Sequence, residues 1–523
     1  MYRVWISIFL LCAAVTEGGK VLVYPVDGSH WVNMKVLIEE LHSRGHQVAV
    51  FRPRDSWYIK EKSRFYTSIP LDHDSGFDEE FVSTFVTQLM KLQQEGTSIW
   101  APYELMMEMA QKASEMHKKS SNLLEALLEN KALIRSLKEE HYDLILTDPA
   151  IPAGTILSHY LKIPLVFNVR WAGSGEGHFV LAPSPLSYIP MTGTEFSDKM
   201  SFSERVFNML GYIYGEYQTA VYIAPHYTKV INKYLGPEMD YNSIFQAADL
   251  WLMRVDFVFE FPRPTMPNII YIGGFQCKPA KPLPEDLEEF VQSSGEHGVI
   301  VMSLGTLIGA LPGDIANNIA AAFARLPQKV IWRHTGDRPT TLGNNTLLVD
   351  WMPQKDLLGH PKVKLFVPHG GTNGVQEAIY HGVPILGMPL IFDQPDNVLR
   401  IVARGAGKMI RFSQLTEETF YKDLQEVLTN PSYRSNMQRL SRLHRDQPKT
   451  PMDTAIFWLE FVMRHKGAAH LRSESFKLSW YQYHCVDVML VLATVVILTV
   501  GLVASFIRCL CSIVCRRTKR KHD

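Results

Sequence analysis

The sequence predicts an α/β protein with two Rossmann-like domains and one membrane-spanning helix near its carboxyl end. Two βαβ patterns support the domains, one opening at Lys20 and the other at Gly298. A long apolar run over Val486–Ile507 supports the membrane helix. The chain has 523 residues, which is enough for two or more domains with sizeable cores.

Composition and charge narrow the functional classes. Hydrophobic residues make up 46% of the chain and charged residues 20%. This is the composition of a globular protein with a small excess of hydrophobic residues, as a membrane segment would add. The 53 Lys and Arg residues balance 53 Asp and Glu residues, so the formal net charge is zero. Binding to a phosphate backbone needs a surplus of basic residues, so we do not expect nucleic acid as a partner.

The first βαβ unit begins the amino-terminal domain. We expect a buried strand at Val21–Pro25, an amphipathic helix at Trp31–Ser43 and a second strand at Gln47–Phe51. His30 then falls in the loop between the first strand and the helix, at the strand's carboxyl end. On position alone, a histidine here can be a solvated loop residue or a catalytic base.

A second polar residue follows another predicted strand of this domain. Tyr142–Thr147 ends at Asp148, and further strands are expected at Lys162–Asn168 and Leu250–Arg254. Asp148 either forms a turn before Pro149 or accepts a hydrogen bond from the His30 imidazole and stabilises its protonated form.

Two other patterns do not point to a metal site. Asp72-His73-Asp74 imitates an acidic pair that holds a divalent cation, but it lies in a polar, acidic segment without a strong preceding strand, so we expect a solvated loop. Cys277 is the one cysteine well inside the part of the chain between the amino-terminal apolar run and the expected membrane helix. One cysteine there excludes a disulfide framework or a cysteine metal cluster.

The segment between Trp171 and Leu235 is rich in aromatic and small residues. Its aromatic side chains include Tyr188, Phe202, Phe207, Tyr212, Tyr214, Tyr217, Tyr222 and Tyr227. They either form helix core or line an apolar pocket. Gly173-Ser174-Gly175-Glu176-Gly177 does not have the spacing of the dinucleotide fingerprint and is set aside.

The second domain is expected after a linker rich in proline and lysine at Cys277–Pro284. A buried strand at Gly298–Ser303 leads into a small polar turn suited to a phosphate. Lys329–Arg333 is the following strand. Arg333 at its end could give a diphosphate a charge-assisted hydrogen bond.

A glycine turn is the strongest feature of this domain. The strand Lys364–Pro368 leads into His369-Gly370-Gly371-Thr372-Asn373-Gly374, and a helix is expected from Asn373 to Gly382. Glycines let the backbone approach a ligand closely, and the first helical amides point at it unpaired. The natural ligand is a phosphate or diphosphate.

The stretch Trp351–Gln394 resembles the signature of nucleotide-sugar-dependent glycosyltransferases that act on small lipophilic molecules, and within them the vertebrate UDP-glucuronosyltransferases. The matching residues, in order, are Trp351, Gln354, His369 to Asn373, Glu377, Asp393 and Gln394. Cys277–Pro284 and Arg445–Leu471 resemble the same family, so the resemblance covers essentially the whole chain. It implies the GT-B type of fold, with two facing Rossmann-like domains and the site in the cleft.

The resemblance also implies residue roles. His30 is the general base, supported by Asp148. On the donor side, Trp351 stacks on uracil, Gln354 bonds the nucleoside and Glu377 bonds the ribose. The diphosphate is held by Ser303, His369, Gly371 and Asn373. The sugar hydroxyls are bonded by Asp393 and Gln394. Arg254 matches an arginine that meets the donor's charged groups; it can equally be an ordinary surface arginine.

The implied reaction is an inverting transfer of glucuronic acid from UDP-glucuronate to a small lipophilic acceptor. UDP-glucuronate is a co-substrate, and neither a cofactor nor a metal is expected. One alternative is the same chemistry with UDP-glucose, UDP-galactose or UDP-N-acetylglucosamine. Another is a membrane-anchored protein that binds a nucleotide sugar or lipophile without chemistry. The resemblance also implies that the chain can form homo-oligomers, or hetero-oligomers with related enzymes.

The two ends of the chain predict its topology. Arg3 and the apolar run Val4–Val15 form a secretory signal too short to span a bilayer. The basic tail after Ile507 places that tail in the cytosol and the body in the lumen, a single-pass type I arrangement. The last residues resemble an endoplasmic reticulum retrieval signal, and Asn344 lies in an N-glycosylation sequon.

The expected segments are a signal peptide at 1–19, an acceptor-binding domain at 20–276, a linker at 277–285, a donor-binding domain at 286–450, a helical segment at 451–485, a transmembrane helix at 486–507 and a cytosolic tail at 508–523.

Overall fold

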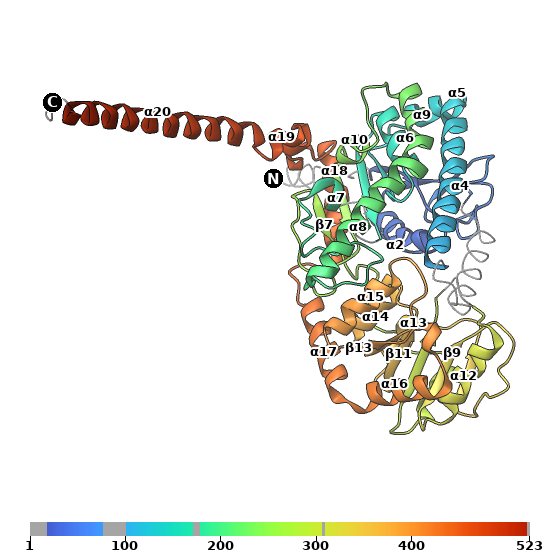
Figure 1. Ribbon diagram of the computed structural model, residues 1–523. Coiled ribbons are helices and arrows are strands. Elements are labelled where there is room, and N and C mark those ends of the chain that lie inside the picture. The colour runs from blue at the N-terminus through green and yellow to red at the C-terminus, as the bar shows by residue number, and fades with distance from the viewer. Residues whose placement is uncertain (1–17, 77–100, 171–177, 306–308, 520–523) are drawn as a thin grey trace, which may run out of the picture. The chain divides into compact units, whose positions relative to one another are not determined.

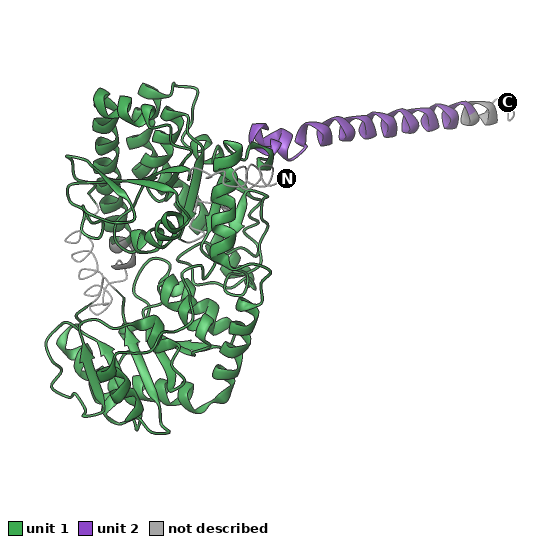
Figure 2. Ribbon diagram, turned by 180° about the vertical axis from the view of Figure 1, so that it is seen from behind, with its two compact units in different colours: residues 1–472 green, residues 473–523 purple. Residues whose placement is uncertain are grey.

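The structure is a computed structural model that describes residues 18–76, 101–170, 178–305 and 309–519. The apolar run of the expected signal peptide and the Gly173–Gly177 stretch lie outside the described residues. The chain forms two compact units, residues 1–472 and residues 473–523 (Figure 2).

The first unit contains two parallel sheets. Over the described residues the first sheet has seven strands, in the order β3-β2-β1-β4-β5-β6-β7. The strands are β1 (Lys20–Tyr24), β2 (Gln47–Arg52), β3 (Thr67–Pro70), β4 (Leu144–Thr147), β5 (Leu165–Val169), β6 (Leu250–Met253) and β7 (Ile269–Tyr271). The chain order reverses between β1 and β4, and ligands bind α/β sheets beyond the carboxyl ends of such strands.

Helices flank this sheet (Figure 1). They are α2 (Ser29–Ser43), α4 (Ala101–Glu129), α5 (Lys131–Glu139), α6 (Ala153–Leu161), α7 (His178–Leu181), α8 (Phe202–Gln218), the π-helical turn η1 (Thr219–Ile223), α9 (Ala224–Tyr234) and α10 (Ser243–Gln246). The expectation that His30 precedes the helix was wrong. Gly28 makes the turn with a φ of 68°, so α2 begins at Ser29 and His30 lies in its first turn.

The second sheet has six strands within the described residues, all parallel, in the order β10-β9-β8-β11-β12-β13. They are β8 (Val299–Ser303), β9 (Lys329–Arg333), β10 (Thr346–Val349), β11 (Val363–Pro368), β12 (Ile385–Gly387) and β13 (Gly407–Met409). Here the order reverses between β8 and β11. The turns after these two strands therefore meet at one edge of the sheet.

The helices of the second half are α11 (Glu285–Gln292), α12 (Gly313–Ala324), α13 (Gln354–Leu358), α14 (Thr372–His381), α15 (Gln394–Ala403), η2 (Phe412–Gln414), α16 (Glu417–Thr429) and α17 (Pro431–Arg445). As expected, α14 follows the glycine turn and ends at Gly382, which takes the left-handed conformation with a φ of 72°. Its apolar face, with Val375, Ala378 and Ile379, is buried.

The chain then returns to the first half. Helix α18 (Pro451–His465) lies among the elements of the first sheet, and the turn η3 (Ala469–Leu471) follows it (Figure 1). Ile456, Leu459 and Val462 are fully buried in the same apolar cluster as Val21 of β1 and Leu37 of α2. Each such side chain contributes roughly 1.5–3 kcal/mol of burial energy, so α18 belongs to the core of the first half.

The second unit contains η4 (Glu474–Lys477), α19 (Trp480–Tyr483) and α20 (Val486–Lys519). In the described part of the chain, Val486–Ile513 is the one helical stretch long and apolar enough to cross a membrane, with a mean hydropathy of 2.7 over its most apolar window. Its 28 residues span about 42 Å, more than the roughly 30 Å of a bilayer's hydrocarbon core.

Candidate active site

His30 and Asp148 meet where the strand order of the first sheet reverses. His30 follows β1, and Asp148 follows β4. The Nδ1 atom of His30 lies 2.6 Å from Oδ2 of Asp148, and both side chains are almost completely buried. A hydrogen bond from Nδ1–H to this carboxylate fixes the tautomer in which the lone pair is on Nε2.

The surroundings of this pair favour a neutral imidazole. Burial lowers the pKa of His30, and the cations Arg170 and Arg254 lower it further, whereas Asp148 raises it. Burial alone would raise the pKa of Asp148, but His30, the Ala150 amide and Arg254 hold it below its usual range. The pair therefore has the form of a base with an ionised partner.

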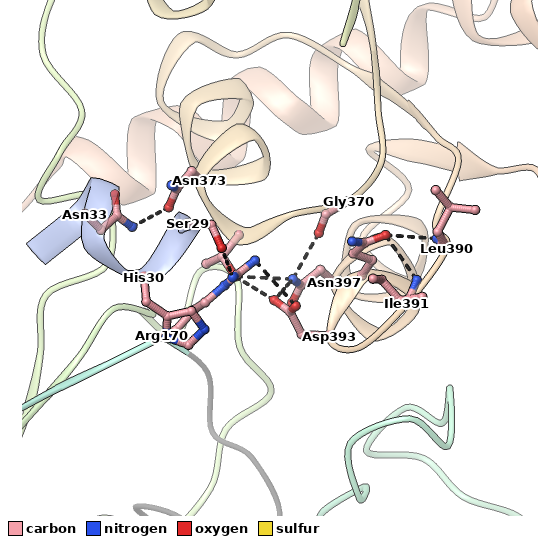
Figure 3. A network of polar contacts seen from close by, with 12 residues as sticks. Ser29, His30, Asn33, Arg170, Gly370, Asn373, Leu390, Ile391, Asp393 and Asn397 are labelled. Atoms are coloured by element: carbon pink, nitrogen blue, oxygen red, sulfur yellow. Dashed lines mark hydrogen bonds and ion pairs between the residues drawn. The ribbon is translucent and has the colours of Figure 1, made fainter. Parts of the chain in front are cut away.

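Arg170 connects this pair to the second half. It follows β5, donates from Nη1 to Oγ of Ser29, and places Nη2 3.8 Å from Oδ1 of Asp393 (Figure 3). Asn33, one turn beyond His30 on α2, donates to the side chain of Asn373 in α14 (Figure 3). Side chains of the first half thus contact Asp393 and Asn373, which lie at the starts of two helices in the second half.

Arg254 is an unusual buried cation just after β6. It is 1% exposed, and within the described residues none of its three guanidinium nitrogens has a hydrogen-bond partner. Burial lowers its pKa to about 9, and the nearby carboxylates of Asp148 and Asp393 partly offset this. A buried guanidinium without hydrogen-bond partners is costly, because its charge is removed from water without compensation.

The glycine turns of the second half approach each other around His369. A Cβ on Gly371 would lie 2.5 Å from the His369 ring, and a Cβ on Gly305 would lie 2.5 Å from another atom of the same ring. Gly371 is the N-cap of α14 and provides no side-chain cap, so the first amides of the helix are left for a ligand. Burial lowers the pKa of His369 to about 4, so this ring is neutral at pH 7.

A cavity of about 520 Å³ joins the two halves. Ser29, Asn33 and Arg170 line it from the first half. From the second half the lining includes eight of the residues expected to bind the donor: Ser303, Arg333, Trp351, Gln354, His369, Gly371, Asn373 and Glu377. Residues separated along the sequence are therefore brought to one concave surface.

Individual donor-side residues have distinct environments in this cavity. Trp351 is 74% exposed, so its ring face is accessible. Gln354 donates to Oε2 of Glu377 at 2.7 Å, and burial raises the pKa of Glu377 to about 7. Arg333 lines the cavity at the end of β9, where its guanidinium donates to the backbone oxygens of Gly305 and Asp350.

Asp393 and Gln394 begin α15 and are buried beside this cavity. Asp393 accepts from Thr372 at 2.8 Å and from Asn397 at 2.7 Å through Oδ2, while its Oδ1 has no hydrogen-bond donor among the described residues. The side-chain oxygen of Gln394 accepts from the backbone amides of Leu390 and Ile391 (Figure 3). That oxygen therefore holds the turn before α15.

The aromatic segment differs from a helix core. Phe202, Phe207 and Tyr217 of α8 are more than half exposed, whereas Tyr227 of α9 is fully buried. The face of α8 that packs inward carries the buried Asn208. Of the two alternatives, helix core therefore fits Tyr227 but not these three α8 residues, whose side chains lie away from the packed face.

The Asp72-His73-Asp74 segment follows β3 as an exposed loop. Asp74 forms a two-point ion pair with Arg54, with both contacts at 2.9 Å. Within the described residues, no cluster of three or more His, Cys, Asp or Glu side chains has the arrangement of a metal site.

Sequence reasoning missed Ser29, Asn33 and Arg170. One signal could have found Arg170, because it comes directly after a buried parallel strand on the edge that carries His30 and Asp148. Asn33 lies three residues after His30, on the same face of α2. The contacts of both with the second half depend on how the halves meet, which no local pattern encodes.

The chain has two parallel α/β halves with facing carboxyl edges, a buried histidine–aspartate pair on one and an uncapped helix start on the other. These features define a GT-B type glycosyltransferase. A solved structure with this fold is the calicheamicin glycosyltransferase CalG4, with a TM-score of 0.57, 16% sequence identity, and coverage of 86% of this chain and 99% of that one. At this identity the likeness shows the fold alone.

Sequence relatives identify the family. The family model "UDP-glucoronosyl and UDP-glucosyl transferase" matches residues 19–521. The rat UDP-glucuronosyltransferase 2B1 is 44% identical, covering 98% of this chain and 97% of its own. The mouse UDP-glucuronosyltransferase 2A1 is 42% identical, with 92% of each chain covered. The chain belongs to the family of UDP-glucuronosyl and UDP-glucosyl transferases and is a transferase enzyme.

Proposed function

We propose that this enzyme transfers glucuronic acid from UDP-glucuronate to a hydroxyl group of small lipophilic acceptors, with inversion to the β-glucuronide. The buried His30–Asp148 pair, next in sequence to Ser29 of the cavity lining, is the observation that carries the proposal. The names of the relatives support UDP-glucuronate as the donor.

His30 acts as the general base. Its Nε2 accepts the proton of the acceptor hydroxyl, and the oxygen attacks the anomeric carbon from the face opposite the diphosphate. Asp148 holds the ring through Nδ1 and stabilises the imidazolium that forms. Burial and the two arginines keep His30 neutral before the reaction, which is the state a base requires.

The second half binds the donor. Trp351 stacks on the uracil, Gln354 bonds the nucleoside, and Glu377 accepts from the ribose hydroxyls. The diphosphate is held by Ser303, His369, Gly371 and Asn373. The positive end of α14 and the Arg333 guanidinium stabilise the charge that develops on the departing UDP.

Arg254 receives the carboxylate of the glucuronate. Its buried guanidinium has no hydrogen-bond partner within the described residues and lies in the field of both Asp148 and Asp393. Asp393 bonds a sugar hydroxyl through Oδ1, and Gln394 contributes through its amide group, since its oxygen holds the preceding turn. A neutral hexose would leave Arg254 unpaired, which favours glucuronate over glucose.

The membrane arrangement is part of the proposal. The helix Val486–Ile513 anchors the enzyme, with residues 20–485 in the lumen of the endoplasmic reticulum and a short basic tail in the cytosol. The first domain comprises 20–276 together with α18, and the second comprises 286–450, joined by the linker 277–285. Asn344 is exposed in the turn before β10, where a glycan can be attached.

A donor panel tests the proposed function. Membranes from cells expressing the full chain are supplied with 4-methylumbelliferone and one UDP-sugar at a time, and the product mass is measured. The proposal predicts a glucuronide from UDP-glucuronate and little product from UDP-glucose, UDP-galactose or UDP-N-acetylglucosamine. A hexoside as the main product would overturn the donor assignment. UDP binding without any transfer would favour a binding protein.

A further inference from the structure

A loop of the first half is fixed between two helices. This loop, Tyr188–Glu195, is held from one side by Asn208 of α8, which is fully buried. Asn208 accepts from the amide of Met191 at 2.6 Å and donates to the carbonyl of Ile189 at 2.8 Å. The contacts define the position of the loop within its own half.

The other side of the Tyr188–Glu195 loop is held by Asp396 of α15, in the second half. Its Oδ2 accepts from the amide of Gly193 at 2.7 Å, and its Oδ1 accepts from the amide of Glu195 at 3.1 Å. Asp396 is only 7% exposed. Arg411 adds an ion pair with the Glu195 side chain, Nη1 lying 3.1 Å from Oε1.

The loop backbone is shaped for this carboxylate. Gly193 and Glu195 both have positive φ angles, 85° and 55°, which turn their amides toward Asp396. Alternating backbone of this kind forms an anion-binding concavity. Burial raises the pKa of Asp396 to about 6, and Arg400 together with the Gly193 and Glu195 amides opposes this rise, so the carboxylate is ionised at pH 7. Arg400, one turn further along α15, also forms an ion pair of 2.9 Å with Glu260 of the first half.

Asp396 lies one helical turn after Asp393. That turn rises about 4.5 Å along α15, so one rigid segment carries both the proposed contact to the sugar and the contact to the loop. Asp393 in turn lies 3.8 Å from Arg170, which bonds Ser29 next to His30. The Tyr188–Glu195 loop is therefore bonded to the same helix start that carries Asp393, the proposed contact to the sugar.

We propose that Asp396 is a positioning residue that sets the Tyr188–Glu195 loop as one wall of the acceptor site. The inference rests on the proposed function and adds to it a determinant of acceptor binding in the donor-binding half. Asp396 touches neither donor nor acceptor. It acts through the loop, so its loss should weaken acceptor binding and leave donor binding nearly unchanged.

Two variants test the contact from its two sides. Asp396→Asn keeps the shape but removes the charge and places an amide NH₂ against a backbone N–H. Gly193→Ala leaves Asp396 intact, and its Cβ would meet no atom within 4 Å, so it acts only by straining the positive φ. Asp74→Asn is the control for the loss of a carboxylate, because Asp74 pairs with Arg54 in an exposed loop after β3.

The KM values for 4-methylumbelliferone and for UDP-glucuronate are measured for each variant in membranes. We expect the acceptor KM to rise about tenfold in Asp396→Asn, the effect of losing one charge-assisted hydrogen bond, with the UDP-glucuronate KM changed less than about twofold. Gly193→Ala should give the same pattern. Unchanged acceptor KM values, or a parallel rise of both KM values as in a general loosening of the halves, would overturn the inference.

The inference and the proposed function can fail separately. A wild-type enzyme that prefers another UDP-sugar contradicts the proposed function, and the same KM comparison with that sugar then decides the inference.

Limited chymotrypsin digestion tests the contact without measuring enzyme activity. Cleavage after Tyr188 should be faster in Asp396→Asn and Gly193→Ala than in the wild type, and equal rates would contradict the contact's role.

Discussion

The imidazole of His30 and the carboxylate of Asp148 are 2.6 Å apart, although 118 residues separate them in the sequence. Their contact follows from the sheet, because β1 and β4 are paired neighbours and both residues follow the carboxyl ends of these strands. The reversal of strand order leaves a crevice at this edge. The fold thereby brings the proposed base and its partner together next to Ser29, which lines the cavity.

Asp148→Asn removes the ionised partner while keeping its size. We expect kcat to fall by about 10²–10⁴, because the imidazolium loses its stabilising charge and the ring its preferred tautomer. Both KM values should change little in steady-state assays with 4-methylumbelliferone. Asp74→Asn is the control, since Asp74 lies in an exposed loop and pairs with Arg54. Full turnover in Asp148→Asn would contradict the role of the pair.

The pH dependence of kcat/KM reports the state of His30. Burial lowers its pKa below the usual 6.5, and activity is lost as pH falls through that lowered pKa, because a protonated ring cannot act as a base. The acid limb should therefore lie below pH 6.5. Arg254→Met should move the limb upward, since Arg254 lowers the pKa of His30. An acid limb above the usual histidine value in the wild type would be inconsistent with a buried neutral base.

Arg254→Met also separates stability from donor binding. Removing a buried guanidinium without partners among the described residues should not lower the thermal unfolding midpoint of the enzyme without donor. The KM for UDP-glucuronate should rise about tenfold or more, because a charged hydrogen bond to the carboxylate is lost. The affinity for UDP alone should stay nearly constant. An unchanged KM for UDP-glucuronate would show that Arg254 does not meet the carboxylate.

Two positions on α18 test its place in the first half. Leu459 is fully buried in the core with β1 and α2, whereas Phe457 is 40% exposed on the same helix. Leu459→Ala should lower the free energy of unfolding by about 2–5 kcal/mol. Phe457→Ala should cost much less, and the thermal midpoints of the two purified variants give the comparison. Equal midpoints would mean that α18 does not contribute to this core.

Much of the fold follows from local sequence patterns. The buried run Lys329–Arg333 predicted β9 with its observed bounds, and other runs predicted strands whose bounds differ by one to three residues. Gly382 predicted the end of α14. The short strands β3 and β7 and the return of α18 were not predicted. Thr67–Pro70 is only partly buried, and the position of α18 depends on packing against β1 and α2. Periodicity identifies an apolar face but not its partner.

In the candidate site, too, local sequence patterns predicted some residues, whereas residues that depend on tertiary contacts were not predicted. The turn at His369–Gly374 was predicted from its glycines, and His30 and Asp148 were predicted from strand ends and family resemblance. Arg170 and Asp396 were not found. Arg170 carries one local signal, its position directly after a buried parallel strand, but its contact with Asp393 and the contacts of Asp396 with the loop depend on how the two halves meet.

His30→Ala is the most direct test of the catalytic account. His42→Ala on the same helix is the control, because His42 is exposed at the other end of α2. Glucuronide formation from 4-methylumbelliferone and binding of UDP are measured for both variants in membranes holding the full chain. The account predicts that His30→Ala loses at least about 10²-fold in kcat while UDP binding and the His42→Ala rate stay at wild-type levels. Glucuronide formation by His30→Ala at the wild-type rate would contradict it.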